Sequence, residues 1–409
     1  MDTNPVPRRT ATAAFFVLML PYGISGGYSV TLAFQLARAG MTTGAIAVIM
    51  ALSTWTQTWK VAWAPLVDAT LGYKRWHVIG TIATALAVLG LGVVPARPDQ
   101  AVLLSVMVVA VGIASSITSM STEGLAALSI EDGRRGDASG WFSAGNLGGV
   151  GLGGGLALWL GQQVASPWVP AAALAALCLA CTAVLPLVRP FVAGSERLTP
   201  LAGIKEIGRS LWALGASRAG LTVIVLMLVP VGSGAAQSLW AAVAGDWRAG
   251  AGTVALVNGV LGGLASLVGS VVGGRLCDRI DRKLAYCLFG LALAATTAAM
   301  AVLPRTPASF VGMTLAYAVV LGACYAAYGA VVLEVVGVRA AATKFQLLAS
   351  LSNVPIALLI GWDGAFHDRG GSRAMLWGEA LVGVAGVLAF LLLAGALKAG
   401  GAVVARRSR

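Results

Sequence analysis

The most informative feature of this 409-residue chain is how little charge it carries. Charged residues make up 11% of the sequence and hydrophobic residues 58%, whereas ordinary globular chains are about 25% charged. This composition excludes the two or three soluble domains that the length alone would allow. Histidine is scarcer still, with two residues in the whole chain. Because no nucleophile–base pair, metal-ligand spacing or ATP-binding motif is present, the sequence does not predict an enzyme.

The five cysteines do not indicate a particular chemistry either. Cys178 and Cys181 form a C-x-x-C, but it lies inside an apolar segment with no second pair and no nearby histidine. We interpret them as small residues at which helices pack, and we expect neither a metal nor another cofactor.

What the chain does contain is a series of long apolar segments. Each is about 20 residues or longer, enough to cross a roughly 30 Å hydrocarbon core as a helix. No segment alternates like the strand of a membrane barrel, and a helix satisfies its own backbone hydrogen bonds in lipid. The sequence therefore predicts an all-α polytopic membrane protein with twelve transmembrane helices, at residues 11–37, 43–66, 77–95, 101–128, 138–162, 167–188, 219–244, 252–274, 284–303, 308–334, 345–365 and 374–397.

The basic residues indicate how these helices are oriented. Most of the 28 lysine and arginine residues fall before the first span, in alternate loops and in the C-terminal tail. Positively charged loops stay in the cytoplasm, so both termini are predicted to be cytoplasmic, in a multi-pass protein of the inner membrane. The net charge of +12 is then a consequence of topology, and no nucleic-acid partner is needed to explain it.

The two halves of the chain contain similar motifs at corresponding positions. "PLVDATLGYKR" after the second span corresponds to "RLCDRIDRK" after the eighth, and Asn146 in span 5 corresponds to Asn353 in span 11. The separation is about half the chain in both cases, which is typical of parallel repeats in transporters. We therefore expect two six-helix bundles, 1–188 and 218–409, joined by a cytoplasmic linker, 189–217, with an interfacial amphipathic helix. We expect a monomer.

Glycines at helical spacing suggest close helix packing. The stripes are Gly145, Gly149 and Gly153 with Gly151 and Gly155 beside them, Gly259 with Gly263, and Gly269 with Gly273. Two interpretations stay open: static packing within each bundle, or a smooth seam along which the two bundles move.

A short motif, an aspartate followed by basic residues, ends the second span and recurs after the eighth. The predicted gating residues are Asp68, Lys74, Arg75, Asp278, Arg279, Arg282 and Lys283, with Glu334 expected to pair with Arg339 or Lys344. "GRLCDRIDRK" resembles the cytoplasmic signature of the major facilitator superfamily, G-x-x-x-D-R-x-G-R-K, with Asp281 in place of the usual glycine. The resemblance covers the whole chain and implies the major facilitator fold.

Further motifs narrow the resemblance. "WKVAWAPLVD", "TKFQLLASLSNV" and "GLALWL" are similar to segments of the AmpG-type muropeptide permeases and their acetyl-CoA transporter relatives. In that group a Q-D-x-x-x-D stands in the fourth span, where this chain has Thr122, Glu123 and then Ala127. Related siderophore permeases are an alternative that the resemblance leaves open.

Burying an ionisable residue inside a membrane span costs free energy, so such residues usually have a functional or pairing role. Lys60 either reaches back to the inner interface with its amine or pairs with Glu123 or an anionic group of a solute. Glu123 is either a structural helix-to-helix contact or, as we predict, the residue that exchanges a proton during transport.

Polar and aromatic residues at mid-span depth are candidates for binding a solute. They are Tyr22, Ser25, Tyr28, Gln57, Lys60, Ser119, Asn146, Gln237, Trp240, Asn258, Tyr325, Tyr328 and Asn353. Pro21 and Pro230 are predicted to break spans 1 and 7 at matched positions, which is where transporters place a binding site.

The sequence thus predicts a secondary active transporter that takes up a medium-sized polar solute, such as a muropeptide, an acyl-CoA-like molecule or a siderophore, together with protons. The alternative is a transporter-like sensor or assembly partner that binds its ligand without moving it.

Overall fold

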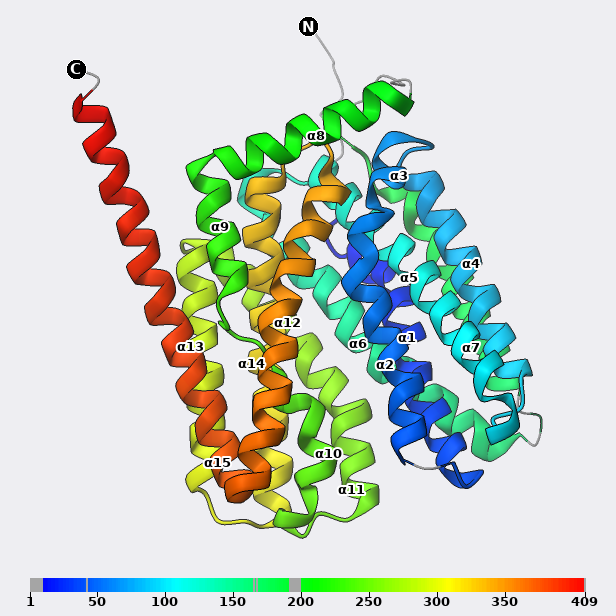
Figure 1. The fold of residues 1–409 in the computed structure, drawn as a ribbon. Helices are drawn as coiled ribbons and strands as arrows, with labels where there is room; N and C mark the ends of the chain where they lie inside the picture. Colours follow the sequence, from blue (N-terminus) through cyan, green and yellow to red (C-terminus); the bar gives the residue numbers. More distant parts are fainter. Residues whose placement is uncertain (1–9, 42, 165, 167, 191–199, 408–409) are drawn as a thin grey trace, which may run out of the picture.

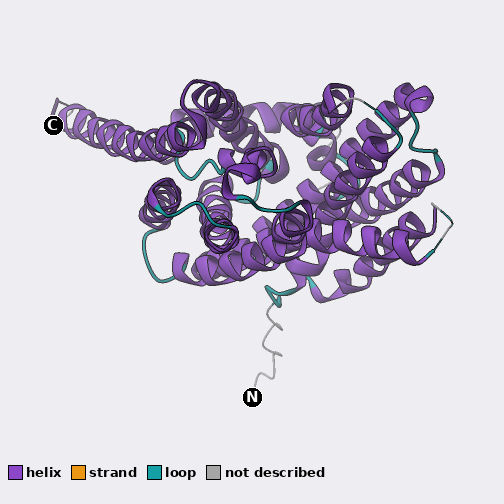
Figure 2. Ribbon diagram, turned by 90° about the horizontal axis from the view of Figure 1, so that it is seen from below, coloured by secondary structure: helices purple, strands orange, loops and turns teal. Residues whose placement is uncertain are grey.

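Helices build this protein throughout the residues that the computed structural model describes, which are 10–41, 43–164, 166, 168–190 and 200–407 (Figures 1 and 2). The helices of the first half of the chain lie side by side in one group, and those of the second half form a group next to it (Figure 1). The all-helical fold predicted from the sequence is confirmed.

The helix bounds follow the predicted spans closely. The first group contains α1 (Ala14–Arg38), α2 (Thr43–Trp59), α3 (Ala64–Ala69), α4 (Tyr73–Val93), α5 (Ala101–Ser129), α6 (Arg135–Gln163) and α7 (Trp168–Ala180). The second contains α9 (Arg218–Leu228), α10 (Trp240–Val243), α11 (Ala251–Leu256), α12 (Gly262–Cys277), α13 (Arg282–Val302), α14 (Pro307–Val336) and α15 (Ala341–Arg407). Residues 370 and 371 have non-helical backbone angles, so α15 is two helices, as spans 11 and 12 predict.

Seven helices among the described residues are long and apolar enough to cross a membrane, or eight if α9 is joined to the helix before it. Several predicted spans fall outside this count: α2 has only 17 residues and the seventh span is divided between α9 and α10, whereas α6 is an unbroken helix of 29 residues that is rich in glycine. Breaks within the spans position side chains, and three of them matter for the site.

The helix before α9, α8 (Pro200–Ala216), lies across one end of the other helices and is bent by 82° from α9 (Figure 1). Ile207 and Leu214 are buried against the protein, while Ile204 and Trp212 are exposed. An apolar residue on the outward side of a helix at this position suits the membrane interface. The linker residues 191–199 lie outside the described part of the chain.

The second span is interrupted between α2 and α3, where Lys60–Ala62 form a 3₁₀ turn. Pro65 explains the break, because a proline ring clashes with the carbonyl group four residues earlier in an α-helix, here that of Val61. The eighth span contains a π-helical turn at Val257–Leu261, a feature that is frequent at functional sites.

The two prolines predicted to break helices behave differently. The helix α9 ends at Leu228, two residues before Pro230, as predicted. Gly232 and Gly234 follow with positive φ angles of 60° and 71°. The prediction for Pro21 is wrong, because α1 runs through it without interruption. Close packing accounts for the difference: a Cβ on Gly23 would lie 2.2 Å from the Asn146 carbonyl oxygen of α6, so the neighbouring helix holds this turn in place.

Some of the glycine stripes pack helices within one half of the chain, and one lies where the two halves meet. Gly149 packs on Gly23 of α1, and Gly269 packs on Val319 of α14, so these stripes serve contacts within one half of the chain. Gly151 instead lies against Gly263, where α6 of the first half meets α12 of the second.

Candidate functional site

A polar cluster lies between the two groups of helices, around Glu123 of α5. The Glu123 carboxylate accepts a hydrogen bond from Ser119 at 3.2 Å and another, a very short one, from the Gln346 side-chain amide of α15. Glu123 is 7% exposed and Gln346 is fully buried. The contact therefore joins the two halves of the chain through a shielded carboxylate. Glu123 lies six residues from the end of α5, or about 9 Å from that end of the helix.

Lys60 and Tyr22 face the same carboxylate from the first half of the chain. Lys60 is 7% exposed, stands in the 3₁₀ break of the second span and interacts electrostatically with Glu123. Tyr22 of α1 is within electrostatic reach of Glu123 and donates a hydrogen bond to the Gln57 side-chain oxygen at 3.0 Å. The Gln57 amide in turn donates to the Gly112 carbonyl at 3.4 Å. The broken helix therefore places a cation beside the buried acid.

The second half of the chain contributes aromatic side chains from α14. Tyr325 interacts with Tyr22, and Tyr328 interacts with Glu123. Tyr328 also packs edge-to-face on Phe345, at 6.2 Å between ring centres, and Phe345 packs in the same way on Phe142 of α6 at 6.1 Å. These three rings connect α6 of the first half with α14 and α15 of the second.

The other predicted binding residues are more scattered. Tyr28 is 2% exposed and belongs to the apolar core of the first half, while Trp240 is 1% exposed and packs edge-to-face on Tyr317 inside the second half. These two side chains lie within a helical group and do not join the Glu123 cluster. The Ser25 hydroxyl donates to the Tyr22 carbonyl within α1.

The four other predicted amides form no hydrogen bond to this cluster among the residues that the structure describes. Asn146, Asn258 and Asn353 are partly buried, and Gln237 is exposed. Asn258 lies in the π-helical turn, and its side-chain oxygen is buried without a hydrogen-bond partner among the described residues.

The aspartate at the end of the second span bonds to backbone rather than to basic side chains. Asp68 accepts hydrogen bonds from the backbone N–H groups of Ala342 at 3.1 Å and Thr343 at 2.7 Å, and from the Thr343 hydroxyl at 2.6 Å. Tyr73 donates to it as well. A carboxylate at this position satisfies the free N–H groups of α15 and is favoured by the helix dipole. Asp68 therefore caps a helix of the other half.

Asp278, the counterpart of Asp68 after the eighth span, caps a helix of the first half. It accepts from the backbone N–H groups of Gly136 and Asp137, each at 2.7 Å, at the start of α6. Arg282 supports the carboxylate at 3.5 Å. Each half of the chain thus caps one helix of the other, at equivalent positions.

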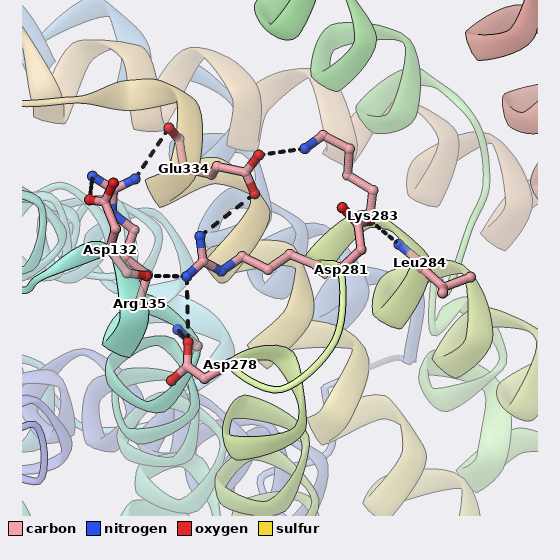
Figure 3. Close-up of polar contacts among 9 residues, drawn as sticks. Asp132, Arg135, Asp278, Asp281, Lys283, Leu284 and Glu334 are labelled. Carbon is pink, nitrogen blue, oxygen red and sulfur yellow. Dashed lines mark hydrogen bonds and ion pairs between the residues drawn. The ribbon is translucent and has the colours of Figure 1, made fainter.

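A network of ion pairs lies beside the Asp278 contact (Figure 3). Arg135 of α6 donates to the Glu334 carbonyl at 3.3 Å and pairs with Asp132 at 2.8 Å. The Glu334 carboxylate pairs with Lys283 at 2.6 Å and with Arg282 at 3.7 Å. The expected partners of Glu334 were wrong, because α13 brings Lys283 closer than the loop that carries Arg339.

Arg339 and Lys344 instead approach α8. Arg339 pairs with Glu206 at 3.2 Å, and both line a cavity of about 400 Å³ together with Lys344. Lys74, Arg75 and Arg279 take no part in the ion pairs found in the described part of the chain. Of the predicted basic residues in the two turns, Arg282 therefore pairs with an aspartate, Asp278, whereas Lys74, Arg75 and Arg279 form no ion pair with either aspartate among the described residues.

Some residues of this region were not predicted. The acid in the place of a signature glycine, Asp281, caps α13 by accepting from the Leu284 N–H at 2.9 Å, which is the ordinary role of aspartate before a helix. Gln346 and Thr343 lie in the "TKFQLLASLSNV" segment, which was quoted only as a motif. Polar side chains at the start of an apolar span could have identified them as candidate site residues.

Comparison with known proteins supports the fold. The sequence profile described as Major Facilitator Superfamily matches residues 10–359. The crystal structure of the human organic anion transporter MFSD10 (TETRAN) is similar with a TM-score of 0.71 and 15% sequence identity, covering 94% of this chain and 100% of that one. At this identity the likeness concerns the fold. No curated protein matches the sequence. The AmpG-type subgroup stays a prediction.

Proposed function

Because this chain belongs to the major facilitator superfamily, a family of membrane transporters, we propose that it is a secondary active transporter that takes up a solute with protons by alternating access. Two six-helix bundles, 1–188 and 218–409, would tilt against one another around the Glu123 cluster, with the linker 189–217 on the inner face of the cell membrane. We place both termini in the cytoplasm, in agreement with the distribution of basic residues.

The reciprocal capping by Asp68 and Asp278 is the observation that carries this proposal. Both contacts join the two halves, and both lie at the α8 end of the molecule. With α8 at the inner leaflet, the state described is closed toward the cytoplasm. A carboxylate that bonds to backbone N–H groups of another helix can leave them for water without breaking any covalent or secondary structure. Such contacts suit a gate that opens and closes.

Glu123 is our proposed proton carrier and Lys60 the proposed contact for an anionic group of the solute. Their burial between the halves and their mutual attraction support this assignment. If a proton neutralised Glu123, the attraction to Lys60 would weaken and the amine would be free to hold an anion. A muropeptide, an acyl-CoA-like molecule and a siderophore all carry anionic groups, and Tyr22, Tyr325 and Tyr328 supply aromatic surface beside them.

The test begins with a thermal-shift screen of the purified protein against muropeptides, acyl-CoA and ferri-siderophores. A compound that raises the melting temperature is then offered to proteoliposomes with an imposed proton gradient, with an uncoupler as control. We expect accumulation that requires the gradient. A compound that binds but never accumulates would overturn the transport proposal and favour a sensor.

Glu123→Gln gives the corresponding test of coupling. We expect this variant to bind the same compound while its uptake loses most of its dependence on external pH. Uptake that stays as steeply pH-dependent as in the wild type would show that the proton is carried elsewhere.

A further inference from the structure

Two buried acids lie inside the second half of the chain, away from the Glu123 cluster. Asp363 is fully buried in the first part of α15, and Glu379 is 5% exposed in the part after the break at residues 370 and 371. They stand seven and eight residues from that break, or about 10 to 12 Å along the helices. Both therefore lie within the membrane-spanning part, nearer the end opposite α8.

The two carboxyl groups have unequal surroundings. Glu379 accepts a hydrogen bond from the Tyr317 hydroxyl of α14 at 2.7 Å and interacts with the backbone N–H of Ala236. Asp363 has no hydrogen-bond partner for either oxygen among the described residues. The two acids interact electrostatically with one another and with Tyr317. The better-satisfied carboxyl is therefore Glu379.

Among the residues that the structure describes, no positive charge is paired with these two acids, because neither carboxyl forms an ion pair with a lysine or arginine. Cys324 interacts electrostatically with Tyr317, and His367 lies one helical turn after Asp363 in contact with the exposed Asp368. Arg369 and Arg373, on either side of the break in α15, are both exposed. Arg305 is engaged by Asp246 at 3.9 Å.

Two further polar atoms near Tyr317 are buried and have no hydrogen-bond partner among the described residues. They are the Trp240 indole N–H, whose ring packs on Tyr317 at 5.2 Å between ring centres, and the Thr314 hydroxyl one turn before Tyr317. Burying two ionised carboxylates together without a cation costs several kcal/mol for each ion, so the arrangement requires a positive charge on one of them. A proton is the smallest such charge and needs no ring of ligands.

We propose that Asp363 and Glu379 form a proton-binding site in which Asp363 carries the proton and Glu379, held by Tyr317, stays the anion. The proton comes from water at the end opposite α8 and returns to water as the Asp363 O–H bond breaks. α15 also carries the N-terminus that Asp68 caps, so the proton is bound on a helix of the gate. Its use in coupling rests on the proposed function, whereas the binding of the proton does not.

Infrared difference spectroscopy of the purified protein tests the site without any solute. The C=O stretch of a protonated carboxyl differs from that of a carboxylate and shifts in D₂O. At neutral pH we expect such a band in the wild type, its loss in Asp363→Asn, and its retention in Asp368→Asn, a matched change at an exposed acid of the same helix. Asp363→Glu, which keeps a protonatable group, should restore a displaced band if Asp363→Asn proves unstable.

Two results would overturn the proposal. One is a protonated-carboxyl band that survives unchanged in Asp363→Asn. The other is a melting temperature that rises with sodium at constant pH in the wild type but not in Asp363→Asn, which would make the pair an alkali-cation site. Failure of the uptake experiments would leave the infrared result unaffected, so the two hypotheses fail separately.

Discussion

Gly274→Ala is expected to open the α8 end of the molecule without weakening the fold of either half. A Cβ at Gly274 would lie 2.4 Å from the Gly136 carbonyl oxygen and 2.7 Å from the Gly140 Cα. Both neighbours are backbone atoms of α6, so no side chain can turn aside and the two halves must separate slightly. Overpacking of this kind costs about 1–3 kcal/mol. The cost falls only on the state in which α6 and α12 touch.

The magnitude follows from that selective cost. A tenfold change in an equilibrium corresponds to about 1.4 kcal/mol, so the population open at the α8 end should rise about 5-fold to 150-fold. Gly269→Ala is the matched control, because its Cβ would lie 1.8 Å from the Val319 carbonyl oxygen, a neighbour in the same half. That variant strains both states alike. It should lower the melting temperature and leave the conformational equilibrium unchanged.

A single reporter cysteine measures the opening. The five native cysteines, all buried, are first replaced, and Ser139→Cys is introduced on α6, where the Ser139 hydroxyl donates to the Ala326 carbonyl of the other half at 2.6 Å. Labelling by a membrane-impermeant maleimide from the cytoplasmic side then requires the halves to part. We expect faster labelling with Gly274→Ala and less than about a twofold change with Gly269→Ala. Equal acceleration by both, or none by Gly274→Ala, would refute the reasoning.

Other substitutions test the remaining contacts. Asp68→Asn and Asp278→Asn each weaken charge-assisted hydrogen bonds to a helix N-terminus, and each should accelerate the same labelling about tenfold or more; no change in either variant would contradict the gate. Lys60→Gln should abolish the thermal shift produced by an anionic solute and spare the fold, as the melting curve without solute will show. Asp281→Ala removes the cap of α13, and calorimetry or melting should reveal a loss of about 1 kcal/mol of stability with no effect on labelling.

The fold was largely predictable because span length and hydropathy depend on the chain alone. The apolar ranges 77–95, 101–128 and 284–303 reappear as α4, α5 and α13. What a single sequence does not contain is the neighbour of each helix. Pro21 was expected to break α1, yet the contact between Gly23 and α6 holds the helix together.

The site was predictable to a smaller extent for the same reason. Glu123, Lys60 and Tyr22 were chosen for depth and polarity, and the structure brings them together. Depth does not tell which way a side chain points, so Tyr28 and Trp240, chosen on the same grounds, lie in the cores of the two halves.

The identity of the gate contacts changes which residues should matter. The basic turns after spans 2 and 8 suggested a latch of arginine and aspartate, but both aspartates bind backbone N–H groups at the start of a helix in the opposite half. Backbone donors cannot be removed by substitution, so mutation can change the acids, the close approach of the helices and the supporting side chains, such as the Thr343 hydroxyl on Asp68 and Arg282 on Asp278. The contact is also reciprocal, and opening the α8 end requires both caps to break. The loss of either one therefore favours the open state, while the remaining cap still allows the halves to close again.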